Sequence, residues 1–90
     1  MPCFVYVLGS FDQRGWRTYV GWTTDIERRL NQHNNGKGAR STRGRLWTLL
    51  YGECYTTRHE AMSREWHLKQ DKRFRKSLTD NMANNQPCSS

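Results

Sequence analysis

The stretch TYVGWTTDIERRLNQHN, residues 18–34, contains a change from strand to helix around which the rest of the chain can be placed. Its aromatic and β-branched first half predicts a strand over residues 17–22. Thr24 and Glu27 then form the S/T-x-x-E pattern, in which a hydroxyl and a carboxylate satisfy the first free amides of a helix. A helix should therefore begin at Asp25, and it should end near residues 34–36, where Asn and Gly suit a left-handed cap.

Two polar side chains lie at the apolar face of this predicted helix. Ile26 and Leu30 share that face with His33, and Arg29 borders it. Arg29 could bind an anion, or it could lay its aliphatic stem over the apolar face. His33 could take part in chemistry, or it could interact as a cation with the helix C-terminus. The helix pattern alone leaves both choices open.

Two further segments predict strands. Residues 3–8, CFVYVL, are typical of a strand and should pair with residues 17–22 as an antiparallel hairpin. Residues 46–55, LWTLLYGECY, predict a third strand that bends or bulges at Gly52. Between the helix and this strand, residues 36–45 form a glycine-rich loop with four cations and no acid.

The last third of the chain predicts two helices. Thr57 and Glu60 repeat the capping pattern, so a helix should run over residues 58–70. A short basic helix should follow over residues 72–78, and the polar residues 80–90 should form a disordered tail. The order β-β-α-β-α-α indicates an α+β fold, a small three-stranded antiparallel sheet flanked by helices, in a single domain of residues 1–79.

The composition limits the functional classes. The chain has 90 residues and a formal net charge of +7, which attracts polyanions such as nucleic acids but does not identify one. No stretch approaches the roughly 18 apolar residues of a membrane span, and no signal peptide is evident, so we expect a cytoplasmic protein. The three scattered cysteines argue against a disulfide framework and against a zinc site.

Five polar side chains could form a site if both longer helices pack on the sheet: Tyr6, Tyr19, Arg29, His33 and Glu65. Each has a role if the substrate is a phosphodiester. Arginine binds phosphate oxygens, a carboxylate holds a divalent cation, and a tyrosine or histidine takes a proton from water. Glu65 is notable because it falls inside the apolar arc of its helix, although an ion pair with Lys69 would also explain it.

A family resemblance favours the site. The runs VYV (residues 5–7) and YVG (residues 19–21), followed by ERRL and QHN, resemble the GIY-YIG nuclease domain. YVGWTTDIERRLNQHNNGKGARSTRG, followed by EAMSREWHLKQ, is similar to the small free-standing bacterial GIY-YIG proteins of the YhbQ-like group. The resemblance covers about residues 4–78. It implies a nuclease fold and a metal-dependent reaction on DNA.

The resemblance also implies roles for single residues. Tyr6 matches the tyrosine that closes the first tripeptide, and Tyr19 the one that opens the second. Arg29 matches the phosphate-binding arginine, His33 a position that assists proton transfer, and Glu65 the single ligand of Mg²⁺ or Mn²⁺. Which of Tyr6, Tyr19 and His33 is the general base is left open.

The sequence departs from the family pattern in two places. The glycine and isoleucine of the first tripeptide are Phe4 and Val5, changes that should affect packing alone. The asparagine that larger relatives carry beyond the metal-binding glutamate is Ser77 here, which could weaken support of the site.

Together these features predict a divalent-metal-dependent DNA endonuclease, acting in DNA repair or processing on DNA that is branched, nicked or single-stranded. The basic loop should position the nucleic-acid backbone through four side chains: Lys37, Arg40, Arg43 and Arg45. The alternative is a nucleic-acid-binding module that keeps the scaffold and does not cleave.

Overall fold

The computed structural model of the chain describes residues 2–84. Its elements are, in order, β1 (Cys3–Asp12), β2 (Gly15–Thr23), α1 (Ile26–Asn34), the 3-10 helix η1 (Arg40–Thr42), β3 (Thr48–Tyr55), α2 (Arg58–Gln70) and α3 (Lys72–Asn84). The strands form one antiparallel sheet in the order β2-β1-β3. The predicted fold class and the predicted order of strands and longer helices are confirmed.

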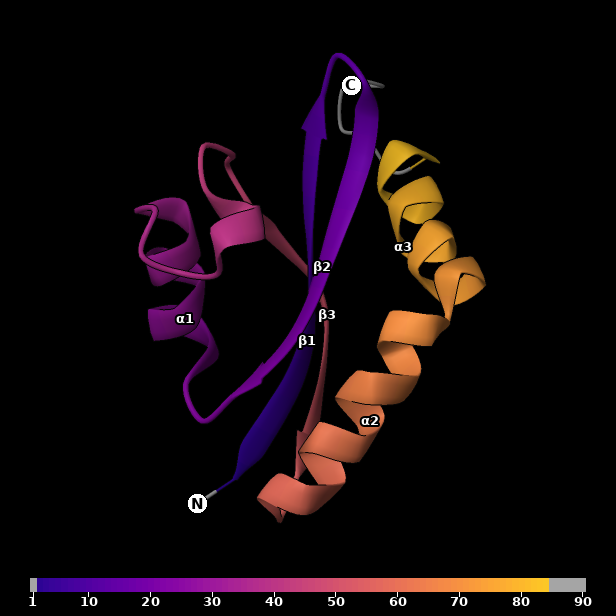
Figure 1. Cartoon of the computed structure of the whole chain (residues 1–90). Coiled ribbons are helices and arrows are strands. Elements are labelled where there is room, and N and C mark those ends of the chain that lie inside the picture. Colours follow the sequence, from indigo (N-terminus) through magenta and orange to yellow (C-terminus); the bar gives the residue numbers. More distant parts are fainter. Residues whose placement is uncertain (1, 85–90) are drawn as a thin grey trace.

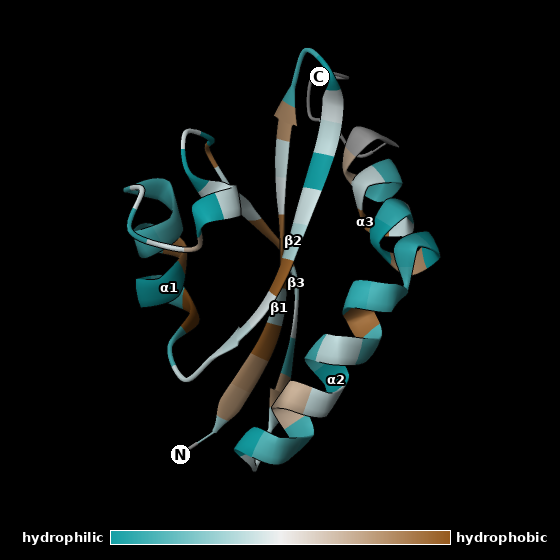
Figure 2. Cartoon of the chain, in the orientation of Figure 1, coloured by the Kyte–Doolittle hydropathy of each residue, from teal (hydrophilic) through white to brown (hydrophobic). Residues whose placement is uncertain are grey.

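The sheet separates two layers (Figure 1). α1 and the segment that contains η1 lie on one face, and α2 and α3 cover the other. Hydrophobic residues are concentrated along the strands, whereas much of the helix surface is hydrophilic (Figure 2). Among residues 2–84, no helix has both the length and the apolar character needed to cross a bilayer.

The central strand β1 supplies core residues to both layers because successive side chains of a strand point to opposite faces. Val5 and Val7 pack in a cluster with Leu68 of α2. Tyr6 and Leu8 belong to the cluster on the other face, beneath α1. The alternation in β1 therefore directs the Tyr6 side chain toward α1, where the predicted site residues of that helix lie.

The hairpin of β1 and β2 is longer than predicted. The ladder continues to the pair Asp12 and Gly15, and a two-residue turn closes it. Gly15 has a φ of +105°, which glycine adopts without a Cβ clash. Phe11 and Trp16 face each other across the ladder with ring centroids 5.2 Å apart. This aromatic pair extends the hairpin beyond the segments that the sequence pattern identified.

The bulge of β3 lies at a different residue from the predicted Gly52. The register of β1 with β3 shifts between Val7 and Leu8, which pair with Tyr51 and Leu49, so Leu50 is the extra residue. A Cβ at Gly9 would lie 2.5 Å from Leu50 Cδ1, so Leu50 occupies space that this glycine leaves open. The prediction placed the bulge at the glycine of β3, but the glycine that accommodates it is on the partner strand.

The start of α1 also differs from the prediction. The N-cap is Asp25, whose carboxylate accepts the amide of Arg28 at 3.1 Å. Thr23 Oγ1 accepts the amide of Asp25 at 3.2 Å and holds the cap residue in place. Glu27 consequently lies in the first turn, where its charge favours the helix N-terminus, and it does not act as the capping-box carboxylate.

The end of α1 and the start of α2 agree with the sequence patterns. Gly36 has a φ of +75°, and the amide of Lys37 donates to the carbonyl of Gln32 at 2.8 Å, as in a Schellman cap. At α2, Thr57 Oγ1 accepts the amide of Glu60 at 3.2 Å and donates to its carboxylate at 3.0 Å. The predicted bounds of α2 are confirmed.

α3 continues to Asn84, so the predicted disordered tail is wrong for its first residues. The buried Thr79 donates its hydroxyl to the carbonyl of Lys76 at 2.9 Å, and Lys76 pairs with Asp80 at 3.1 Å. These local contacts keep a polar segment helical, although its composition is typical of a tail. Residues 85–90, which complete the predicted tail, lie outside the described residues.

Candidate active site

The centre of the candidate site is a buried contact between β1 and α1. The Tyr6 hydroxyl lies 3.0 Å from Nε2 of His33, in the last turn of α1. The two side chains are 2% and 0% exposed. Tyr6 crosses over its β2 partner, Gly21, where a Cβ would lie 2.5 Å from the phenol oxygen. A glycine at this position therefore makes room for the tyrosine.

The second nitrogen of His33 is held by η1. Nδ1 lies 2.8 Å from Oγ1 of Thr42, and the Thr42 hydroxyl donates to the carbonyl of Ala39 at 2.7 Å. Because a hydroxyl has only one proton, Thr42 must accept from His33, and Nδ1 therefore carries the hydrogen. Nε2 of the neutral imidazole then has the lone pair and accepts the hydroxyl proton of Tyr6.

Further contacts fix the loop against His33. Gly38 packs so closely on the imidazole that a Cβ would lie 2.3 Å from Nδ1. The indole of Trp47 donates to the carbonyl of Thr42 at 2.8 Å. The Trp47 amide donates to Asn34 Oδ1 at 2.6 Å, and Asn34 Nδ2 donates back to the Trp47 carbonyl at 3.1 Å. Gly38 and Thr42 within the loop therefore fix the His33 ring, and the contacts of Trp47 and Asn34 fix the loop itself.

The electrostatic environment keeps both partners of this hydrogen bond neutral at pH 7. Burial raises the pKa of Tyr6 to about 12, an effect that the charge of Glu65 reinforces and the nearby Arg29 guanidinium opposes. Burial, together with the positive charge of Arg29, lowers the pKa of His33 below its usual value of about 6.5. His33 is therefore a proton acceptor and Tyr6 a proton donor in the resting site.

Tyr19, the second predicted tyrosine, packs against the same histidine. Its ring centroid is 4.8 Å from that of His33 and 6.4 Å from that of Tyr6. Trp47 approaches Tyr19 edge to face at 6.4 Å. The structure thus brings Tyr6, Tyr19 and His33 together as the sequence predicted, and the hydrogen bond to His33 distinguishes Tyr6 from Tyr19.

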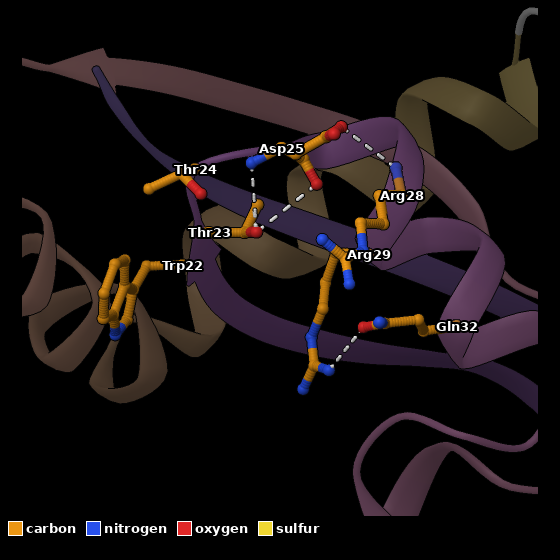
Figure 3. A pocket seen from close by; sticks show the side chains of 7 residues that line it. All are labelled: Trp22, Thr23, Thr24, Asp25, Arg28, Arg29 and Gln32. Atoms are coloured by element: carbon orange, nitrogen blue, oxygen red, sulfur yellow. Dashed lines mark hydrogen bonds between the residues drawn. The ribbon is translucent and has the colours of Figure 1, made fainter. Parts of the chain in front are cut away.

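Arg29 lines an open cleft beside these residues. Its Nη1 donates to Oε1 of Gln32, one helical turn away, at 2.9 Å. The cleft measures about 440 Å³, and Figure 3 shows Trp22 across from Arg29 and Gln32. The exposed Arg28 lines the same cleft. The Arg29 guanidinium also interacts with the Tyr6 hydroxyl, and its remaining donors are available to an anion.

Glu65 approaches from the other layer. It lies on α2, which packs against β1 and β2, and its side chain is 21% exposed. Its carboxylate is 3.8 Å from Lys69 Nζ, so the alternative ion pair is present but long. The Glu65 charge contributes to the raised pKa of Tyr6, although less than burial and the neighbouring Tyr19 do.

A metal at Glu65 would have a single protein carboxylate as its ligand. Within residues 2–84, no group of three or more His, Cys, Asp or Glu side chains is arranged to hold a metal ion. Mg²⁺ commonly keeps several waters and binds through one or two carboxylates together with substrate phosphates. A cation at Glu65 would therefore need the phosphate of a substrate to complete its coordination.

The four cations predicted to bind nucleic acid fall into two groups. Three of them are exposed to solvent: Lys37, Arg40 and Arg43. Arg45 instead forms an ion pair with Asp12 at 2.8 Å and donates from Nε to Ser10 Oγ at 3.1 Å. These bonds direct its guanidinium to the hairpin, so Arg45 links the loop to β1, and its contact with nucleic acid stays a prediction.

Sequence reasoning missed three residues of the site. Gln32 orients Arg29, whereas Thr42 and Gly38 position His33. Thr42 and Gly38 belong to a loop whose composition indicates only a mobile, cationic segment. Their contacts with His33 depend on how the loop returns to the sheet, so no local pattern in the sequence identifies them.

The small antiparallel sheet thus carries tyrosines on two strands, with an arginine and a histidine on one neighbouring helix and a glutamate on another. The model of the family described as "GIY-YIG catalytic domain" matches residues 2–78. The chain therefore belongs to the GIY-YIG family of nuclease domains, and the resemblance found in the sequence is confirmed.

Several relatives carry the name UPF0213. One from Streptococcus agalactiae is 47% identical over 74 residues, which are 81% of each chain. One from Haloquadratum walsbyi is 43% identical over 74 residues, 81% of this chain and 80% of the relative. The solution NMR structure of a UPF0213 protein from Bacillus halodurans is 35% identical, covers 89% of this chain and 84% of its own, and has a TM-score of 0.49.

Proposed function

We propose that the protein is a divalent-metal-dependent endonuclease that hydrolyses phosphodiester bonds in DNA. The observation that carries the proposal is the hydrogen-bonded series from Tyr6 through His33 to Thr42, beside Arg29 and in the field of Glu65. A buried phenol needs a hydrogen-bond acceptor, and here the acceptor is an imidazole, a group that can also take up the proton. Membership of a nuclease family supports the same reaction class.

Tyr6 and His33 act together as the base in this proposal. A water molecule next to the phenol gives a proton to the Tyr6 oxygen while Tyr6 passes its own proton to His33 Nε2. The hydroxide so formed makes the new bond to phosphorus, and the bond from phosphorus to the leaving sugar oxygen breaks. The leaving oxygen takes a proton from solvent, and His33 later releases its extra proton. Tyr6 therefore never has to ionise in the resting protein, where its pKa is about 12.

Arg29 and Glu65 supply the electrostatic part. The free donors of Arg29 bind the oxygens of the scissile phosphate and offset the negative charge that develops as hydroxide attacks. Glu65 is the protein ligand for Mg²⁺ or Mn²⁺, which when bound supplies positive charge at the phosphate and at the departing oxygen. Thr42 keeps the imidazole in the tautomer that can accept the proton.

The exposed cations of the loop provide affinity without base readout. Lys37, Arg40 and Arg43 are free of the structural contacts that hold Arg45, and contacts from such side chains to phosphates position nucleic acid. The formal net charge of +7 acts in the same direction. Binding should therefore weaken steeply as salt is added.

The test is a cleavage assay with the purified protein on single-stranded, duplex, nicked and branched DNA, in Mg²⁺, in Mn²⁺ and in EDTA. We expect the wild type to cut at least one substrate with a divalent cation and none in EDTA. Glu65→Gln should reduce the rate about 100-fold or more. Glu27→Gln, at an exposed carboxylate of α1, is the matched control and should cut normally.

Two outcomes contradict the proposal. Equal cleavage by the wild type and Glu65→Gln would remove Glu65 from the reaction. Salt-dependent binding without any product would indicate the non-cleaving module on the same scaffold.

A further inference from the structure

A second cleft lies between β2 and α3, apart from the candidate active site. It measures about 190 Å³. Two side chains of β2 and four of α3 line it: Trp16, Thr18, Lys72, Arg75, Lys76 and Thr79. Three of the six are cationic, and none is acidic. The cleft is therefore a concave, positively charged surface that the proposed reaction does not use.

Arg75 gives this cleft a fixed positive charge. Its Nη1 donates to Thr18 Oγ1 at 2.9 Å, while Nε and Nη2 donate to the carbonyls of Leu68 and Lys69 at 3.2 and 2.9 Å. All three acceptors are uncharged. Across residues 2–84, no carboxylate lies within ion-pair distance of the guanidinium. The carbonyls at the end of α2 orient the side chain but leave its net charge for an external anion.

Two exposed lysines complete the cleft. Lys72 is exposed at the start of α3. The Lys76 side chain is 74% exposed and pairs at 3.1 Å with Asp80, whose side chain is 58% exposed. A surface pair of this kind contributes only a few tenths of a kcal/mol, so an incoming anion can compete for Lys76. The three lining cations thus exceed the two carboxylates closest to them in the sequence, Asp80 and Asp71, and Asp71 accepts the amide of Phe74 at 3.0 Å.

The position of the cleft relates it to the candidate active site. Thr18 and Gly21 are both on β2, an edge strand of the sheet, and are separated by about 10 Å at the usual rise of a strand. Arg75 is bonded to the last turn of α2, the helix that also carries Glu65. A polyanion lying along the β2 edge could therefore contact the cleft and the reaction centre together.

We propose that the cleft between β2 and α3 binds a backbone phosphate of the nucleic-acid substrate, with Lys72 and Lys76 contacting the phosphate and Arg75 supplying the fixed charge. The inference rests on the proposed function, because it concerns the same substrate. A nucleic acid fits better than a single small anion, since its phosphates repeat along the chain and can occupy both places. The cleft would fix where the substrate strand runs relative to the scissile phosphate.

The experiment measures equilibrium binding of DNA over a range of salt concentrations, in EDTA so that cleavage does not interfere. Lys72→Gln is compared with Arg73→Gln, an equal loss of charge at the adjacent exposed position, which does not line the cleft. The logarithm of the binding constant falls with the logarithm of salt by about 0.7 to 0.9 for each phosphate contact. We expect Lys72→Gln to reduce this slope by about that amount, Lys72→Arg to restore it, and Arg73→Gln to leave it nearly unchanged.

A double variant, Lys72→Gln with Lys76→Gln, should lower the slope further and raise KM for cleavage more than it lowers kcat. Equal slopes for Lys72→Gln and Arg73→Gln, in a protein that still cuts DNA, would overturn the second site and leave the proposed function intact. A wild type that shows no salt-dependent binding would overturn both. Unchanged thermal unfolding midpoints show that the variants remain folded.

Discussion

The hydroxyl end of Tyr6 lies directly over Gly21 of the neighbouring strand. A Cβ at Gly21 would be 2.5 Å from the Tyr6 oxygen and 2.8 Å from Cζ, distances at which one of the two residues must move. The reach of Tyr6 to His33 therefore depends on a missing side chain in β2. This relationship gives a physical reason for the glycine in the YVG run.

Gly21→Ala should displace Tyr6 and break its hydrogen bond with His33. Because the phenol is buried, we expect the free energy of unfolding to fall by about 1–3 kcal/mol. The cleavage rate should fall by a larger fraction than the free energy of unfolding does. The control is Gly52→Ala, on the other side of Tyr6 in the sheet, where the nearest atom to the new Cβ is Ile26 Cδ1 at 3.6 Å. Denaturant unfolding and cleavage rates measure both; equal effects of the two substitutions would contradict the steric argument.

Thr42→Val should leave the Nδ1 hydrogen of His33 without an acceptor. A buried donor left unsatisfied costs about 1–3 kcal/mol, and the imidazole can then adopt the other tautomer, whose Nε2 cannot accept from Tyr6. Thr42→Ser keeps the hydroxyl and should retain both stability and cleavage. NMR of the imidazole nitrogens would show the tautomer directly. An unchanged tautomer in Thr42→Val would show that Thr42 does not determine it.

Acid should weaken the fold through His33. Its pKa is lowered in the folded protein by burial and by Arg29, so below about pH 6.5 the unfolded chain binds a proton more readily than the folded one. The stability contribution of the neutral histidine is complete above that pH and is lost as the pH falls toward the lower folded pKa. His33→Gln should flatten this part of the curve of unfolding free energy against pH. His67→Gln, at an exposed histidine, should not.

A second acid-sensitive contact joins β3 to α2. Burial alone would raise the pKa of Glu53. Hydrogen bonds from Arg64, Tyr51 and Tyr55 outweigh burial and lower this pKa to about 2. The stability that the ionised Glu53 provides is complete above 4.5, the ordinary pKa of a glutamate, and is lost as the pH falls toward about 2. Glu53→Gln should cost about 1–3 kcal/mol at pH 7 and should remove this acid dependence. The exposed Asp80→Asn is the control, and a similar acid profile in wild type and Glu53→Gln would contradict the assignment.

Local patterns predicted the elements of this fold well, because caps and alternation act over a few residues. The Thr57 cap and the left-handed Gly36 are examples. The errors arose where a distant residue decides the outcome. The bulge moved to Leu50 because Gly9 on another strand leaves it space. α3 extends through a polar segment because hydrogen bonds and a side-chain pair within the helix support it.

The same distinction applies to the candidate site. Arg29 and His33 were identified because polar groups at an apolar helix face are unusual. Thr42 was missed because its role appears only when η1 folds back on α1. Arg45 shows why a charge count is insufficient, because the count cannot distinguish a cation directed to solvent from one that is bonded to Asp12 and Ser10.

The reciprocal amide contact between Asn34 and Trp47 closes the base of the loop that joins α1 to β3. Within that closed base, Gly38 and Thr42 face the imidazole, while Lys37, Arg40 and Arg43 face solvent. Under the proposed function, substrate binding and the positioning of His33 therefore belong to different residues of one short segment. The outward positions can change during evolution or in a directed library to retune affinity, while the inward ones keep the chemistry constant.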